Sequence, residues 1–218
     1  MTDVALDLEA VREFRSQLLS DLTKYVSSAT IQAAAKRLKL WQHGSVYLDE
    51  EDATAGLTFL QYCMLDFARN GTTALERYMV QHPPETGSIE ERFLDSLAQS
   101  SFTIHKVLQQ LSEDEVELED VSNGQTARVR EKGFWSKAKP GILIATRLVP
   151  LGDVVLTSGV FFGLTAASGD DDSPPRIPPV SNRLQAVART EALLQSLLHH
   201  DPGPASAAPA PVEGHDLA

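Results

Sequence analysis

The sequence is poor in cysteine and in positive charge. Its single cysteine, Cys63, excludes an intrachain disulfide and any zinc site built from several cysteines. Lysine and arginine number 19 against 30 aspartates and glutamates, which gives a net charge of -11 at pH 7. This excess of negative charge disfavours nonspecific binding to nucleic acid or to an anionic membrane surface, and leaves only a local basic patch as a way to bind either.

Long apolar runs are also absent. No run reaches the ~18 residues that a membrane-spanning helix needs, because the longest candidate, residues 141–164, is interrupted by Arg147, Pro150 and Asp153. The first ten residues, MTDVALDLEA, lack the basic and then apolar segments of a secretory signal. We therefore expect a cytoplasmic protein without membrane association. With 218 residues, 42% of them hydrophobic, the chain can bury a proper core.

Local motifs for catalysis and metal binding are missing as well. There is no G-x-S-x-G elbow, no G-x-x-x-x-G-K-[ST] phosphate loop and no G-x-G-x-x-G after a strand. The six histidines show no recognised zinc spacing, and the aspartates 170–172 lack the alternating ligands of a calcium loop. We assign no catalytic, cofactor-binding or metal-binding residue and expect no cofactor and no metal. An enzyme stays an open alternative, since acid–base pairs are assembled in space.

Residues 1–100 have the periodicity of helices. The apolar residues from Leu8 to Tyr25 recur at steps of three or four, which places them on one helix face. Capping boxes at Thr73/Glu76 and Ser88/Glu91 predict two helix starts. The acidic run 49–52 predicts another, because carboxylates in a first turn complement the helix dipole. We predict an all-helical N-terminal unit of about five short helices.

After residue 100 the period changes to 2, which is typical of strands. We predict strands at 102–111, 115–119, 127–130, 142–151 and 154–164. Asn123-Gly124 and Gly152-Asp153 are two-residue hairpin turns, and Gly159 and Gly163 suit bulges or sharp bends. Five short strands joined by tight turns predict a small antiparallel barrel of the OB or SH3-like kind over residues 101–165.

The basic stretch REKGFWSKAKPG, residues 130–141, raises the question of a nucleic-acid surface. With a two-residue turn at 123–124, the residue numbers of each opposed pair add up to 247, so Leu118 faces Val129 inside the barrel. On the outer side this register predicts three acid–base pairs: Glu119 with Arg128, Glu117 with Arg130, and Glu115 with Lys132. We interpret these cations as hairpin partners rather than ligand contacts.

A candidate binding surface is left, formed by Trp135, Lys137, Lys139 and Arg147. An aromatic side chain beside lysines stacks a base and neutralises a phosphate backbone in many barrel modules. In the alternative that we favour, Phe134 and Trp135 plug the open end of the barrel and the lysines are solvated.

The C-terminal region separates into three segments. Residues 166–181 form an acidic, proline-rich linker. Residues 182–200 are predicted to form an amphipathic helix, with Leu184, Val187, Leu194 and Leu198 on one side, that docks on its own chain or on another. Residues 201–218 cannot build a core and should be disordered. The whole chain is thus expected to be an α+β protein.

Three segments resemble a group of uncharacterised bacterial proteins. They are FLQYCMLDFARNGTTALERYMVQHP (59–83), SSFTIHKVLQ (100–109) and PGILIATRLVPLGDVVLTSG (140–159). In the group, a helical unit precedes a small β-domain, and some members carry a SEC-C zinc motif that one cysteine cannot form. The resemblance implies a bacterial, two-part architecture and no activity.

These observations leave the function unknown and favour one class. We predict a non-enzymatic binding or adaptor protein that acts through protein–protein contacts, given the acidic balance. The first alternative is an RNA- or ribosome-associated barrel that uses Trp135, Lys137, Lys139 and Arg147. The second is an enzyme whose site lies between the helical unit and the barrel.

Overall fold

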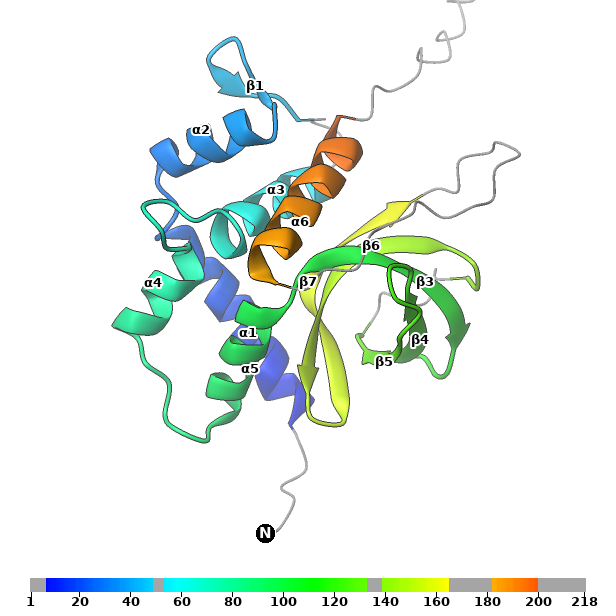
Figure 1. The fold of residues 1–218 in the computed structure, drawn as a ribbon. Helices are drawn as coiled ribbons and strands as arrows, with labels where there is room; N and C mark the ends of the chain where they lie inside the picture. Colours follow the sequence, from blue (N-terminus) through cyan, green and yellow to red (C-terminus); the bar gives the residue numbers. More distant parts are fainter. Residues whose placement is uncertain (1–6, 49–52, 133–138, 165–181, 200–218) are drawn as a thin grey trace, which may run out of the picture.

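The computed structural model describes residues 7–48, 53–132, 139–164 and 182–199, and the α+β prediction is confirmed. Helices gather on one side of a five-stranded barrel (Figure 1). The helices are α1 (Leu8–Thr23), α2 (Ser28–Arg37), α3 (Ala53–Leu65), α4 (Ala74–Gln81), α5 (Ile89–Gln99) and α6 (Arg183–Leu198). The barrel strands are β3 (Phe102–Gln110), β4 (Glu115–Asp120), β5 (Thr126–Arg130), β6 (Leu143–Leu151) and β7 (Val154–Leu164). The sequence analysis did not predict the two-residue strands β1 (Trp41–Gln42) and β2 (Ser45–Val46), which form a small hairpin after α2.

The predicted helix starts follow from local hydrogen bonds. At α4 the Thr73 hydroxyl accepts from the Glu76 amide at 3.2 Å, and the Glu76 carboxylate accepts from the Thr73 amide at 2.7 Å, which confirms the capping box. At α5 Ser88 caps in the same way, but the Glu91 carboxylate accepts from Gly87 instead of the cap residue. The predicted start at 49–52 lies outside the described residues.

The barrel closes in the order β3-β4-β5-β7-β6. All neighbouring pairs are antiparallel except β5 and β7, which run parallel with Val129 opposite Val155. The fully antiparallel barrel that we predicted is therefore wrong in one pair. Five strands cannot alternate in direction all the way round a closed barrel, so one neighbouring pair must be parallel. Since β6 returns to pair with β3, the first four strands have Greek-key order.

One of the two predicted hairpin turns is confirmed and the other is wrong. Leu151 pairs with Val154, so Gly152 and Asp153 form a two-residue turn. Between β4 and β5 the loop is longer, because the Asp120 amide donates to the Gln125 carbonyl at 2.8 Å across four intervening residues. Asp120 Oδ1 accepts from the Ser122 amide at 2.7 Å, a side-chain turn that takes up these additional residues.

The longer loop moves the β4–β5 register by two residues. Opposite residues now sum to 245, so Glu115 faces Arg130, and Leu118 faces Ala127 rather than Val129. A shift of two keeps every side chain on its predicted face, since the side-chain period of a strand is two. The charged residues remain outside the barrel, but each predicted partner is replaced.

The outer charges find other partners. Glu115 lies 3.6 Å from Arg130, and Glu117 accepts a hydrogen bond from Gln109 at 2.7 Å. Lys132 pairs with Glu9 of α1 at 2.9 Å. Part of the basic stretch is thus occupied by carboxylates within the fold, although not by those that the shorter turn predicted.

Apolar side chains form three clusters. One joins α1 and α5 to the outer faces of β6 and β7, and includes Leu18, Phe93 and Leu156. A second joins α2, α3 and α6 to β3, where Leu194 of α6 is 1% exposed. By contrast Leu184, which we predicted on the apolar face of this helix, is 83% exposed. The third fills part of the barrel: Val107, Val116, Leu118, Val129 and Ile144.

Candidate functional site

The residues predicted from the sequence do not form one surface. Trp135 and Lys137 lie outside the described residues, and Lys139 is exposed just before β6. Arg147 is buried, with its side chain 3% exposed, and its guanidinium lies 2.5 Å from the Asp66 carboxylate. It also donates to the Ser100 carbonyl.

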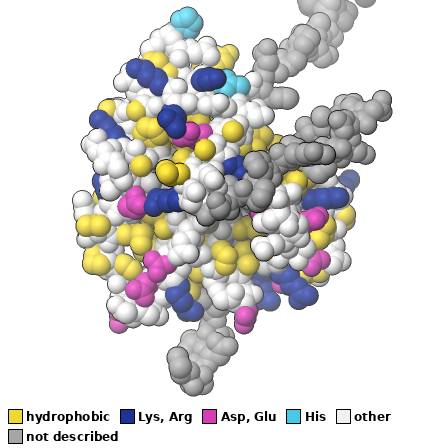
Figure 2. Space-filling model, in the orientation of Figure 1, with side chains coloured by type: hydrophobic (Ala, Val, Ile, Leu, Met, Phe, Trp, Pro, Cys, Tyr) yellow, Lys and Arg dark blue, Asp and Glu magenta, His cyan; other side chains and the backbone are white. Residues whose placement is uncertain are grey.

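Arg147 was therefore wrongly assigned to a binding surface. It lies opposite Phe102 in the β3–β6 pair, on the side of the sheet that the helices cover. Its charge serves to connect β6 with the residues that follow α3 and α5. On the molecular face in Figure 2, lysine and arginine side chains are dispersed among acidic ones and do not form a continuous stripe.

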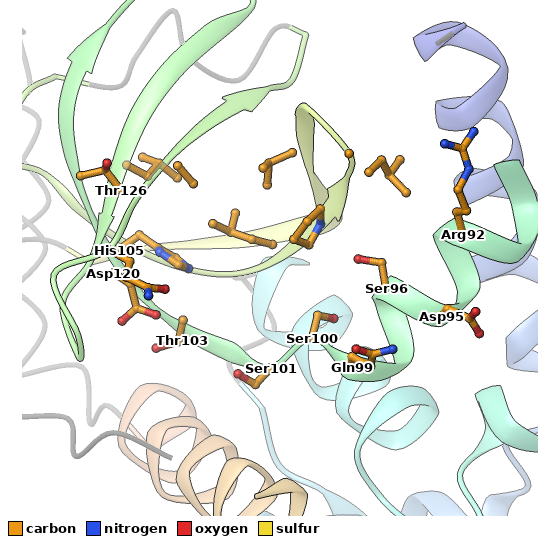
Figure 3. A pocket seen from close by; sticks show the side chains of 18 residues that line it. Arg92, Asp95, Ser96, Gln99, Ser100, Ser101, Thr103, His105, Asp120 and Thr126 are labelled. Atoms are coloured by element: carbon orange, nitrogen blue, oxygen red, sulfur yellow. The ribbon is translucent and has the colours of Figure 1, made fainter. Parts of the chain in front are cut away.

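A different feature stands out, a cavity of about 770 Å³ between one end of the barrel and α5. Its walls come from the starts of β3, β5 and β7, the ends of β4 and β6, and one face of α5 (Figure 3). The lining side chains are mostly small polar or aliphatic, and no phenylalanine, tyrosine or tryptophan is among the described ones. Pockets of 300–1,000 Å³ with a few placed polar groups are typical of small-molecule sites.

His105 lies at the barrel end of this cavity (Figure 3). It faces Ile144 on β6 and Asp120 on β4 and shares the inward-pointing positions of β3 with Val107. The side chain is 2% exposed. Within the described parts of the chain, neither ring nitrogen has a hydrogen-bond partner of acceptable geometry.

The charge state of His105 follows from its burial. Burial lowers its pKa to about 4, against the opposing effects of the Asp120 carboxylate and of the Thr146 backbone, while the Arg189 guanidinium lowers it further. The imidazole is therefore neutral at pH 7. A neutral imidazole has one N–H donor and one acceptor nitrogen, and here both nitrogens are buried and lack a hydrogen-bond partner of acceptable geometry among the described residues.

Thr103 adds a second unsatisfied polar atom to the same site. It lies two residues before His105 on β3, lines the cavity and is 4% exposed. Its hydroxyl oxygen likewise lacks a hydrogen-bond partner in the described portion of the chain. Two residues at adjacent inward positions of one strand thus line the same cavity, and both have buried polar atoms without a partner among the described residues.

One carboxylate of the cavity wall, that of Asp120, lies close to an arginine of α6. Asp120 Oδ1 accepts from both the amide and the hydroxyl of Ser122, at 2.7 and 2.5 Å. Arg189 of α6 donates to the hydroxyls of Ser101 at 3.0 Å and Ser122 at 3.3 Å. Burial lowers the pKa of Arg189 and the Asp120 charge raises it, so the two charges are close enough to influence each other. The C-terminal helix is thereby joined to the cavity wall.

In a second buried polar cluster, at the other end of β5, the carboxylate of Glu131 has several hydrogen-bond donors. Glu131 is 6% exposed and accepts from both terminal nitrogens of Arg15, at 2.7 and 2.9 Å, and from the Thr157 hydroxyl at 2.8 Å. Burial would raise the pKa of Glu131, but these hydrogen bonds and the Arg15 charge outweigh it and lower the pKa. Gly159 makes room for Arg15, because a Cβ at this position would lie 3.3 Å from Arg15 Nε. Its φ of +89° is also a backbone conformation that favours glycine. The bulge predicted at Gly159 is confirmed by the shift of the β6–β7 register between Thr146 and Leu148.

Other chemistry is not indicated. Burial raises the pKa of the Cys63 thiol to about 12, so it is no activated nucleophile. In the described residues no three His, Cys, Asp or Glu side chains are grouped as metal ligands need to be. A search of the same residues finds no helix with the length and apolar character needed to cross a membrane.

His105 was not assigned a role from the sequence. One signal was available: Thr103, His105 and Val107 alternate, so an inward Val107 puts the other two inside the barrel. The opening of the barrel toward α5 depends on how the helices pack, which alternation along one strand does not report.

Comparison with known proteins gives a family without an activity. No curated protein and no solved structure matches the chain. A model described as "Family of unknown function (DUF7986)" matches residues 8–170, well over half of the 218, and this range contains every residue that lines the cavity. Helix α6 lies beyond it. The chain belongs to this family of unknown function, DUF7986.

Proposed function

We propose that this protein binds a small polar molecule in the cavity between the barrel and α5. The observation that carries the proposal is His105, a buried neutral imidazole that lines the cavity with both nitrogens unpartnered among the described residues. A buried polar group left without a hydrogen bond costs about 1–3 kcal/mol of stability. Native proteins tend to break such local rules at functional sites, where a ligand offsets the cost.

The role is one of binding rather than catalysis. A nucleophile needs an adjacent base to activate it, and the hydroxyls of Ser100 and Ser101 are engaged with other groups. Ser100 donates to the Leu97 carbonyl at 2.7 Å, and Ser101 accepts from Arg189 at 3.0 Å. An imidazole with a pKa of about 4 is also a weak base near neutral pH. The non-enzymatic role expected from the sequence stays a prediction.

The barrel topology supports a ligand-binding role. Greek-key order in a five-stranded barrel fits the predicted OB-like kind, whose members bind oligonucleotides and oligosaccharides. For RNA, the outer face of β4 and β5 is unfavourable, because Glu115, Glu117 and Glu119 outnumber Arg128 and Arg130 there. A polyanion would meet net negative charge on that face.

The predicted protein-binding role stays a prediction. Val80 on α4 and Leu184 on α6 are 82% and 83% exposed. An ion pair of 2.6 Å between Glu76 and Arg183 joins these two helices. A protein partner would find its apolar contacts there, away from the cavity.

Replacing His105 by phenylalanine tests the binding function with two measurements. The variant removes both unsatisfied nitrogens, so we expect the free energy of unfolding at pH 7.5 to rise by about 1–2 kcal/mol in chemical denaturation. A library of neutral polar fragments, observed by NMR, should contain binders that shift the His105 ring signals of the wild type. These fragments should bind His105→Phe at least tenfold more weakly.

The matched control is His82→Phe, at an exposed histidine that hydrogen-bonds Tyr25. It should change neither fragment binding nor, by more than about 0.5 kcal/mol, stability. The proposal fails if His105→Phe is less stable than the wild type and no fragment shifts the ring signals. His105 would then have a structural role.

A further inference from the structure

We infer that the molecule held in this cavity is an uncharged, polyhydroxylated one of the saccharide type. The inference rests on the proposed function and specifies its ligand. It follows from the charge balance of the site, from the donors and acceptors that the site leaves open, and from the character of its walls.

Charge balance argues against a charged ligand. Asp95 and Asp120 line the cavity together with Arg92, and Arg189 stands behind the Asp120 wall, so two acids are matched by two bases. An anionic group at the barrel end would meet the Asp120 carboxylate and could not donate a hydrogen bond to it. A cation there would meet Arg189, whose charge already acts on both Asp120 and His105.

The open hydrogen-bonding positions require a ligand that both donates and accepts. The neutral imidazole of His105 has one donor and one acceptor, and the Thr103 hydroxyl can act as either. An ammonium group supplies donors only, and a carboxylate or phosphate supplies acceptors only. Hydroxyl groups supply both. Of these ligand groups, only the hydroxyls of a polyol supply donors and acceptors together.

The walls select against a flat aromatic ligand. Leu118, Ala127, Leu148 and Val155 offer aliphatic surface, and the described lining includes no aromatic ring besides His105 on which a base would stack. Aliphatic walls suit the C–H faces of a sugar ring, while its hydroxyls reach the β3 wall. The opposite side of the cavity, on α5, presents Ser96 and Gln99 as further hydrogen-bonding groups (Figure 3).

The test uses the full chain and one sugar ring in three charge states. Wild-type protein is titrated with D-glucose, D-galactose, D-mannose and maltose while the His105 ring signals, assigned by their loss in His105→Phe, are followed by NMR. The best neutral hexose is then compared with its 2-amino derivative and its uronate. We expect millimolar binding of a neutral sugar and at least tenfold weaker binding of both charged derivatives. In Asp120→Asn the discrimination against the uronate should fall below threefold.

Three results would overturn the inference. Equal or tighter binding of a charged derivative would show that the charge argument is wrong. If fragments from the neutral library bind while every saccharide leaves the His105 signals unmoved, the ligand class is wrong and the proposed binding function stands. If neither fragments nor saccharides bind, both the ligand class and the proposed function fail.

Discussion

Buried polar groups lie near both ends of strand β5, and they differ in whether they are hydrogen-bonded. At its C-terminal end Glu131 receives hydrogen bonds from Arg15 and Thr157. Near its N-terminal end, beside Ala127, the cavity contains His105 and Thr103, which find no such bonds among the described residues. The same barrel thus gives the buried Glu131 carboxylate several donors and leaves His105 and Thr103 without a partner in the described parts of the chain.

The difference separates structural polarity from functional polarity. A paired buried cluster holds elements together, and here it joins α1 to β5 and β7. An unpaired one lowers stability in the absence of a ligand and is retained where binding offsets that cost. This contrast can be measured by removing a group from each cluster.

The largest effect is expected from Arg15→Met. The substitution removes the guanidinium that pairs with both oxygens of the buried Glu131 carboxylate and leaves Arg12, 3.8 Å away, as its charged neighbour. Breaking a buried ion pair typically costs about 3–5 kcal/mol, and Arg12 should keep the loss toward the lower value. Chemical denaturation at pH 7.5 measures the loss. Arg130→Met is the matched control, because its side chain is 48% exposed and its Glu115 partner is 3.6 Å away, so it should cost under about 1 kcal/mol. Similar losses for the two variants would show that the Glu131 cluster is not the structural element we describe.

The burial of His105 should make the free energy of unfolding depend on pH. The pKa of His105 is lowered from 6.5 to about 4 in the folded protein, so between these values the unfolded chain binds more protons. The free energy of unfolding should therefore fall as pH decreases from 6.5 toward 4, by about 3 kcal/mol from this residue alone. Glu131, whose pKa is lowered in the fold, adds to the loss at still lower pH.

His105→Phe isolates the histidine contribution to this pH dependence. Unfolding free energies measured at half-unit steps from pH 7 to pH 4.5 should fall less steeply in the variant than in the wild type. Equal slopes would mean that His105 is protonated as readily in the folded protein as in the unfolded chain. His105 would then not be the buried, unpaired imidazole on which the contrast with Glu131 depends.

Element types were predictable because they depend on local pattern. The strand Val154–Leu164 and the turn at Gly152-Asp153 follow from alternation and turn chemistry, and the structure has them as predicted. The Thr73/Glu76 capping box is equally local. Hydrogen bonds within a few residues decide each of these features, so one sequence contains the whole signal.

Features that depend on distant partners were not predictable in the same way. The β4–β5 register changed because the Asp120 carboxylate bonds Ser122 and extends the turn, a competition that the Asn-Gly pair does not reveal. Arg147 was predicted to be a surface cation, because the alternation of a strand defines two faces but does not show which of them the helices cover. The cavity has the same origin, since α5 meets the end of β6 and the start of β7 there, and these segments lie far apart in the sequence.

The smallest effect is expected for the exposed ion pair between Glu115 and Arg130 on the outer face of β4 and β5. Its coupling energy is a reference for the effects of the buried groups. A double-mutant cycle on Glu115 and Arg130, with both replaced by alanine, should give a coupling of about 0.2–1 kcal/mol that weakens in 1 M salt. The same cycle on Glu117 and Arg130, which a two-residue turn would place opposite each other, should give a coupling near zero. These residues are two positions out of register on a sheet where Glu117 instead accepts from Gln109. If the second coupling exceeds the first, the β4–β5 register is the one in which opposed residue numbers add up to 247. The positions of Asp120 and Ala127 in the cavity wall would then differ from those described above.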